Sequence, residues 1–164
     1  MENEKLVLTI DFGTQSVRAL IINNHGDTLA MEKVAYDQPY FSVKPGYAEQ
    51  HPDYYWEKMK IATLAIKNKH ADLLQKIVAI GVTTFRDSAI LLDKDYQPVR
   101  PMILWLDQRQ AALKKDIPFY KNVLFGLVGM SETIILNRKR TPAIWVQENE
   151  PEIWAKTKYY VNFS

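Results

Sequence analysis

Residues 6–22 read LVLTIDFGTQSVRALII and contain the stretch that decides the fold. Aliphatic and β-branched residues on both sides of a short polar segment predict two strands joined by a tight turn. Gly13 lets the backbone bend at this turn and lets a ligand approach it closely. The stretch therefore predicts a β-hairpin with a polar tip.

The tip of this hairpin has groups that suit a phosphorylated ligand. Asp11 ends the first strand, and a carboxylate there can hold Mg²⁺ directly or through water. The turn from Gly13 to Ser16 offers backbone N–H groups and hydroxyls to phosphate oxygens. An ordinary hairpin is the competing interpretation, and the short Asp-x-Gly-Thr pattern alone favours it because such motifs recur by chance.

The composition is that of one folded domain. The chain has 164 residues, 47% of them hydrophobic and 24% charged, which is enough to bury a core. A net charge of +2 gives no reason to expect a nucleic acid or a membrane surface as partner. The absence of cysteine excludes disulfides and thiol nucleophiles. Because the first residues are polar and no apolar run approaches ~20 residues, we expect a cytoplasmic protein.

Further strands and helices are expected along the rest of the chain. A third strand at 28–36 would complete an antiparallel meander, and the continuous apolar run at 77–83 is typical of a buried parallel strand. The strand at 159–163 is expected to lack a partner, and the basic residues 138–140 to start a solvated helix. The other expected elements are strands at 89–93 and 101–105, and helices from 52 to about 68 and at 108–115, 119–128, 142–149 and 151–156.

Polar side chains follow three of the apolar segments, in residues 11–18, 86–87 and 105–109. In an open sheet, ligands bind outside the carboxyl ends of the strands, so the three groups predict one cleft. The pair Arg86–Asp87 could hydrogen-bond vicinal hydroxyls, and the indole of Trp105 could pack on the C–H face of a sugar. The alternative is a weak surface ion pair and a core tryptophan, and the residues alone leave both interpretations open.

Residues 11–18 (DFGTQSVR) resemble the opening signature of the FGGY family of carbohydrate kinases. Three later blocks resemble the family's next motifs in the family's order: 46–52 (GYAEQHP) with Trp56, 79–87 (AIGVTTFRD), and 103–109 (ILWLDQR). Trp145, residues 148–151 and Trp154 are similar to the helical region that follows. The resemblance covers nearly the whole chain and favours a phosphate-binding turn over an ordinary hairpin.

This resemblance implies an α/β, ribonuclease H-like fold of the actin–hexokinase–chaperone ATPase superfamily. The expected architecture is a mixed sheet with antiparallel first three strands and flanking helices, truncated. The resemblance further implies ATP-dependent phosphorylation of a sugar or polyol, such as a pentulose or glycerol, with ATP and Mg²⁺ as cofactors.

The resemblance also implies roles for ten residues. It makes Asp11 and Arg18 catalytic, with Asp11 orienting the metal and Arg18 neutralising charge on the transferred group. Residues expected to bind the cofactor are Gly13, Thr14, Gln15 and Ser16, and residues expected to line the sugar pocket are Arg86, Asp87, Trp105 and Asp107.

Two departures from the family pattern limit these expectations. Residues 84–87 read Thr-Phe-Arg-Asp, where glycerol kinases have Asn-Gln-Arg-Glu and xylulokinases a Gln-Met-His pattern, so the substrate stays open with a lean towards the glycerol type. The family's general-base aspartate and adenosine pocket are expected beyond Ser164.

Residues 1–164 are thus expected to be the N-terminal part of the first, sugar-binding domain, inactive without the second domain. A non-catalytic sugar-binding or regulatory module of the same fold is the alternative. A third reading, another ATPase of the superfamily, is disfavoured by Trp105 and the block at 46–52. A small sugar or polyol is the expected partner, and assembly as a homodimer stays open.

Overall fold

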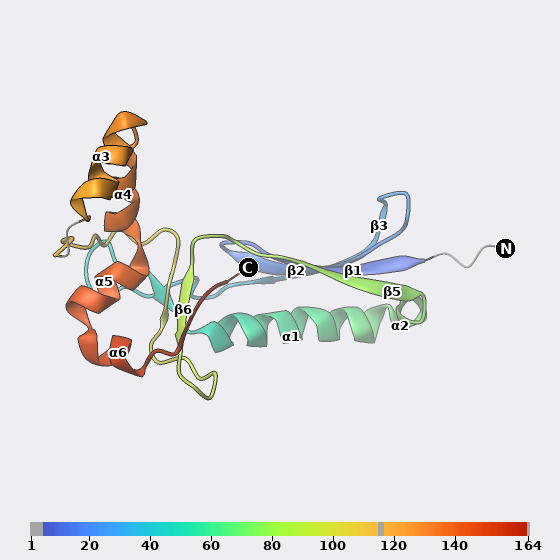
Figure 1. The fold of residues 1–164 in the computed structure, drawn as a ribbon. Coiled ribbons are helices and arrows are strands. Elements are labelled where there is room, and N and C mark those ends of the chain that lie inside the picture. Colours follow the sequence, from blue (N-terminus) through green and yellow to red (C-terminus); the bar gives the residue numbers. More distant parts are fainter. Residues whose placement is uncertain (1–4, 115–116, 164) are drawn as a thin grey trace. The chain divides into compact units, whose positions relative to one another are not determined.

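The computed structural model describes residues 5–114 and 117–163, which form two compact units (Figure 1). The first unit comprises Met1–Phe41, Gln50–Ser88 and Asn162–Ser164, and the second comprises Ser42–Glu49 and Ala89–Val161. Each unit has its own sheet and is described by itself.

The sheet of the first unit begins with the predicted meander. The strands β1 (Leu6–Phe12), β2 (Ser16–Ile22) and β3 (Thr28–Ala35) pair antiparallel in sequence order. Strand β5 (Ile77–Thr83) then pairs parallel with β1, which gives the order β3-β2-β1-β5. The mixed sheet with three antiparallel first strands is therefore confirmed.

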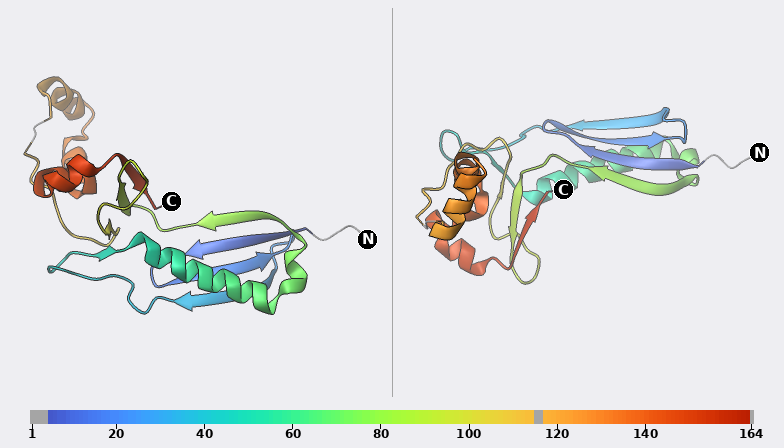
Figure 2. Two further views of the ribbon diagram at one scale, coloured as in Figure 1. Left: turned by 90° about the horizontal axis from the view of Figure 1, so that it is seen from below. Right: turned by 45° about the horizontal axis from the view of Figure 1, so that its top comes forward.

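Helix α1 (Pro52–Lys69) runs along one face of this sheet, over β2 and β3 (Figure 2), and is followed by the short α2 (Ala71–Leu74). Proline in its first turn and Asp53 near its positive end favour the start of α1 where the sequence predicts it. Its buried residues Tyr55, Ala62 and Ile66 supply the helical side of the core. The fully buried residues of β2 alternate along the strand and form the other side: Val17, Ala19 and Ile21.

Strand β5 is parallel, as predicted, but it is not buried among the described residues. Its side chains Val78, Ile80 and Val82 are 60–66% exposed. The reason is positional, because β5 lies at one edge of the sheet while α1 packs on β2 and β3 towards the other edge. The continuous apolar run therefore predicted the strand correctly, but the predicted burial of its side chains is wrong.

An aromatic cluster closes the end of the sheet at which β1 and β5 finish. The ring of Phe163 lies 5.3 Å from that of Phe12 and 5.0 Å from that of Phe85, centroid to centroid. The hydroxyl of Thr84 also donates a hydrogen bond to the carbonyl of Phe163 at 2.7 Å. These contacts fix the segment that follows β5.

The second unit contains a small sheet of order β4-β7-β6-β8 with helices packed against it. Its core consists of Leu91, Ile103, Ala111, Trp145 and Val146. The strands are β4 (Glu49–Gln50), β6 (Ala89–Leu92), β7 (Met102–Ile103) and β8 (Tyr159–Asn162), and the helices are α3 (Phe119–Leu127), α4 (Ser131–Arg140), α5 (Pro142–Asn149) and α6 (Pro151–Lys156). In the described ranges, no helix combines the length and apolar character needed to cross a bilayer.

The prediction that the last strand lacks a partner is wrong. Strand β8 lies next to β6 in the sheet, and the N–H of Lys158 donates to the carbonyl of Leu92 at 2.7 Å. The two segments are far apart in sequence, so no local pattern could reveal their pairing.

The helix predicted at 108–115 does not form in residues 108–114, and Lys115 lies outside the described residues. The backbone N–H groups of this segment bond elsewhere. Those of Ala112 and Lys114 each donate to the carboxylate of Glu148 at 2.7 Å, and that of Ala111 donates to a carbonyl of α4. Because these donors bond to groups of α4 and α5, residues 108–114 form an irregular segment without helical hydrogen bonds.

The basic residues Arg138, Lys139 and Arg140 end a helix instead of starting one. They form the last turn of α4, an element that the sequence reading missed. Cations near the carboxyl end of a helix interact favourably with its dipole, which explains their place.

Candidate active site

The hairpin tip of the first unit is a closely packed turn between β1 and β2. The N–H of Gly13 donates to the carbonyl of Ser16 at 2.9 Å, and the N–H of Tyr36 donates to the carbonyl of Gln15 at 2.9 Å. A Cβ added at Gly13 would lie 3.3 Å from the Ser16 carbonyl oxygen, which is tighter than ordinary contact. The close approach of the two strands therefore favours glycine at this position.

The exposed part of this turn presents two backbone donors. Thr14 and Gln15 are exposed, and in the described part of the chain their N–H groups have no hydrogen-bond acceptor. Ser16 is different, because its side chain is buried. Adjacent free N–H groups beside a hydroxyl can bind an anion.

Asp11 and Arg18 meet across the hairpin beside this turn. They are directly paired in the β1–β2 register, and Nη1 of Arg18 lies 2.7 Å from Oδ2 of Asp11. The two side chains are 35% and 38% exposed, so solvent and ligands reach both. Asp11, Arg18 and the turn from Gly13 to Gln15 thus form one polar edge of the first unit.

Arg86 and Asp87 belong to the same edge. They follow β5, which runs parallel to β1 with Thr83 opposite Asp11, so both strands end on the same side of the sheet. Both residues are exposed, and Asp87 has a φ of 61°. Such left-handed backbone costs energy for a residue other than glycine and is concentrated at functional sites.

Trp105 and Asp107 belong to the second unit and differ from each other. Trp105 follows β7 and is 52% exposed. The side chain of Asp107 is only 2% exposed, and its Oδ2 accepts hydrogen bonds from the N–H of Ala48 at 2.6 Å and from Nη2 of Arg109 at 2.7 Å. The carboxylate of Asp107 is therefore committed to protein donors.

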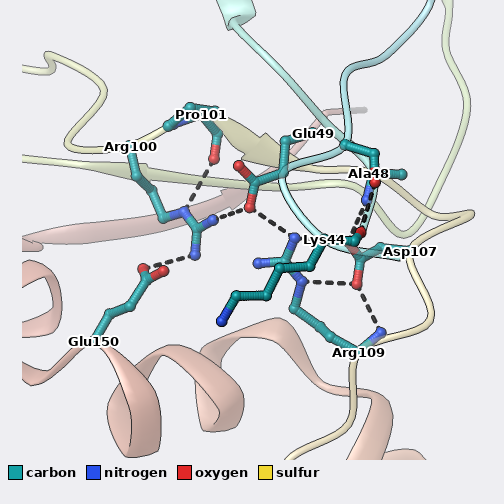
Figure 3. A network of polar contacts seen from close by, with 9 residues as sticks. Lys44, Ala48, Glu49, Arg100, Pro101, Asp107, Arg109 and Glu150 are labelled. Carbon is teal, nitrogen blue, oxygen red and sulfur yellow. Dashed lines mark hydrogen bonds and ion pairs between the residues drawn. The ribbon is translucent and has the colours of Figure 1, made fainter. Parts of the chain in front are cut away.

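A network of ion pairs joins Glu49, Arg100, Asp107, Arg109 and Glu150 in the second unit (Figure 3). Oε1 of Glu49 accepts from Nη2 of Arg109 at 2.6 Å and also from Arg100, whose Nη1 lies 2.8 Å from Oε2 of Glu150. Burial disfavours the charge of Arg109, but the hydrogen bonds that it donates to Asp107 and Glu49 outweigh this effect and raise the pKa of the guanidinium. These contacts hold Ala48 and Glu49 to the segment that contains Asp107 and Arg109, within the second unit.

Aromatic rings enclose the same arginine. The guanidinium carbon of Arg109 lies 4.0 Å from the ring centroid of Tyr47 and 4.6 Å from that of Trp145, at stacking distance. The network borders a cavity of about 560 Å³, which Tyr47, Trp145 and Glu150 help to line.

Sequence reasoning missed Glu49 and Arg100 as structural residues. The only signal was the position of Glu49 inside the block at 46–52, and Arg100 had none. Charged residues are mostly exposed, so their burial here becomes visible only when both partners are seen together.

The donor set at the hairpin tip fits a metal that arrives with phosphates. In residues 5–114 and 117–163, no group of three or more His, Cys, Asp or Glu side chains could hold a metal ion. Asp11 alone, beside two free N–H groups, lacks the ligands of a protein-only cation site. Mg²⁺ commonly binds through one or two carboxylates together with substrate phosphates and water, which is what this edge offers.

Comparison with known proteins gives one consistent family. A model described as the FGGY family of carbohydrate kinases, N-terminal domain, matches residues 6–164. The xylulose kinase of Lactococcus lactis is 30% identical over 155 residues, covering 93% of this chain and 30% of that protein. The glycerol kinase of Mycoplasmopsis pulmonis is 36% identical over 150 residues, covering 91% of this chain and 29% of that protein. The chain thus spans about 30% of the length of these curated relatives.

Solved structures agree at the level of the fold. A xyloylose kinase from Brucella ovis superposes with a TM-score of 0.75 at 24% identity, covering 96% of this chain and 32% of that chain. Plasmodium falciparum glycerol kinase with ADP superposes with a TM-score of 0.63 at 19% identity, covering 98% and 32%. These likenesses confirm the predicted fold class.

Proposed function

Because the chain belongs to the FGGY family of carbohydrate kinases, we propose that the full-length protein transfers the γ-phosphoryl group of ATP to a hydroxyl of a sugar or polyol. Residues 1–164 would be the N-terminal part of its first, sugar-binding domain, with the adenosine pocket in a second domain. The observation that carries the proposal is Asp11 placed beside the free N–H groups of Thr14 and Gln15.

The hairpin tip would bind the phosphates and position the metal. Asp11 would orient Mg²⁺ directly or through water, while the N–H groups of Thr14 and Gln15 bind phosphate oxygens. Arg18 would neutralise negative charge on the γ-phosphoryl group during its transfer. Bound Mg·ATP supplies the phosphoryl group, and the protein contributes positioning and charge stabilisation, which account for most of the catalysis in this class of reaction.

Arg86 and Asp87 of the first unit and Trp105 of the second unit are each proposed to contact the sugar. The guanidinium of Arg86 donates to hydroxyls, the carboxylate of Asp87 accepts from them, and the exposed indole of Trp105 packs on the C–H face of the ring or chain. Asp107 would not contact the sugar directly but would position its surroundings, because its buried carboxylate accepts hydrogen bonds from the backbone of Ala48 and the side chain of Arg109.

A pentulose or a glycerol-like polyol is the proposed substrate. The relatives reported above are xylulose kinase and glycerol kinase, and the Arg86–Asp87 pair leans towards the glycerol type of contact. The proposed setting is the cytoplasm, and a homodimer is the assembly to test first.

The test uses the full-length protein with ATP, Mg²⁺ and a panel of ketoses and polyols. We expect ADP production with at least one of them, and Asp11→Ala should lower kcat by about a hundredfold or more because the metal loses its protein ligand. Binding of the accepted sugar, measured by calorimetry, should change less than about twofold, because Asp11 is proposed to act on the phosphates.

Asp95→Ala is the matched control, since it removes an exposed carboxylate from a turn of the second unit. Its activity should equal that of the unchanged protein. If no member of the panel leads to ADP production, the kinase proposal is wrong. Sugar binding without turnover would favour the non-catalytic module. Loss of folding in Asp11→Ala would make Asp11 a structural residue.

A further inference from the structure

The carboxylate proposed to hold the metal already has a cation on it. Asp11 and Arg18 are direct partners in the β1–β2 register, so the backbone itself keeps them opposite each other at 2.7 Å. Both side chains are more than a third exposed, and an ion pair of that exposure is weak and easily exchanged. The pair is therefore stable enough to form and weak enough to give way to a better partner.

The surroundings make Asp11 a poor site for a metal ion alone. Lys33 lies opposite Arg18 on the next strand and adds a second positive charge to this face. Mg²⁺ gives up its water reluctantly, and a single carboxylate already neutralised by an arginine offers it little.

We infer that Arg18 occupies the place of the metal on Asp11, and that Asp11 binds a divalent cation tightly only together with a nucleotide whose phosphates draw Arg18 away. A guanidinium forms bidentate hydrogen bonds with phosphate oxygens, and a diphosphate or triphosphate carries more negative charge than one carboxylate. This inference rests on the proposed function and adds a coupling to it, because bound nucleotide strengthens the binding of the metal.

The local packing permits the exchange. The guanidinium of Arg18 is part-exposed, and Gly13 lies beside it, since a Cβ added at Gly13 would lie 4.0 Å from Nη1 of Arg18, at ordinary van der Waals contact. The free N–H groups of Thr14 and Gln15 lie in the adjoining turn, where the phosphates that attract Arg18 would bind.

The experiment titrates Mn²⁺ into the full-length protein by electron paramagnetic resonance, with and without ADP. The unchanged protein should bind Mn²⁺ weakly alone and much more tightly with ADP. Arg18→Met should bind Mn²⁺ alone about fivefold more tightly, since the competing cation is gone. The same variant should bind the Mn²⁺–ADP complex about tenfold or more weakly, since the phosphates lose a charged donor.

Two variants separate this exchange from a general change in charge. Arg18→Lys keeps the positive charge and should leave the affinity for Mn²⁺ alone within about twofold of the unchanged protein. Lys33→Met removes a neighbouring charge without touching Asp11, and in 0.15 M salt it should also stay within about twofold because of screening. Only removal of the charge at position 18 should change the two affinities in opposite directions.

Equal binding of Mn²⁺ alone by the unchanged protein and Arg18→Met would overturn the inference, and so would a loss of both affinities in a folded Arg18→Met. If Arg18→Met fails to fold, Arg18→Gln makes the same comparison. Failure of the proposed function has a different signature, namely no Mn²⁺–ADP binding and no turnover in the unchanged protein. The comparison of Mn²⁺ binding without nucleotide, between the unchanged protein and Arg18→Met, gives a clear result whether or not the proposed function holds.

Discussion

At the scale of single residues, the chain uses arginine–carboxylate pairs in two contrasting environments. The pair of Asp11 and Arg18 is part-exposed and exchangeable, whereas the side chains of Arg100 and Arg109 are 6% and 3% exposed and share Glu49. The family motif at residues 11–18 indicated Asp11 and Arg18 as candidates, because both lie on one local hairpin. Sequence motifs gave no structural role to Glu49 or Arg100, whose partners come together only in the folded chain.

Glu49→Gln is expected to destabilise the second unit strongly. It removes the negative charge that two buried guanidinium groups share. Arg109 keeps Asp107 and Arg100 keeps Glu150, so we expect the loss of the shared charge-assisted hydrogen bonds to cost about 2 kcal/mol or more. Urea unfolding at neutral pH measures the loss. Glu150→Gln is the matched control, because the side chain of Glu150 is 30% exposed and pairs with Arg100 alone. Its cost should stay below about 1 kcal/mol, and equal costs for the two variants would contradict the assigned role of Glu49.

At the scale of elements, local patterns predicted what local interactions determine. The β1–β2 hairpin, its extension by β3, and the helices α1, α5 and α6 appear close to the predicted bounds. The helix prediction for residues 108–114 is wrong because Glu148, more than thirty residues away, accepts hydrogen bonds from two of the segment's backbone N–H groups. The predicted burial of β5 is wrong for a related reason, because the sequence of β5 does not show how far α1 extends across the sheet.

The connection between β3 and α1 should depend on pH. Asp37 follows β3 and pairs with Lys58 of α1, and it also accepts a hydrogen bond from the Tyr54 hydroxyl at 2.8 Å. The hydrogen bonds from Lys58 and Tyr54 lower the pKa of Asp37 to about 2. Since the pKa in the unfolded chain is about 3.9, the stabilisation is present above pH ~4 and is lost as the pH falls towards 2.

Asp37→Asn therefore should lower the urea midpoint at pH 6, and lower it much less at pH 2, where about half of Asp37 is already protonated in the unmodified chain. Lys58→Met should show the same convergence, because it removes the main cause of the shift. A gap between Asp37→Asn and the unmodified chain that stays constant from pH 6 to pH 2 would mean that the pair does not stabilise the fold.

At the scale of the whole molecule, fold class and family follow from sequence, and the substrate does not. Four motif blocks in order predicted the family, and the match over residues 6–164 confirms it. The substrate depends on how a few side chains meet a ligand, and residues 84–87 fit neither the glycerol kinase nor the xylulokinase pattern. A family motif specifies the common chemistry of phosphate binding more strongly than the variable contacts to a sugar.

The most direct measurement is a crystal structure of the full-length protein with ADP, Mg²⁺ and the accepted sugar or polyol. The account predicts phosphate oxygens within hydrogen-bond distance of the N–H groups of Thr14 and Gln15. It also predicts the cation on the Asp11 side of those phosphates, and Arg18 turned from Asp11 towards them. A nucleotide bound away from the hairpin tip, with Asp11 contacting neither metal nor metal-bound water, would contradict it.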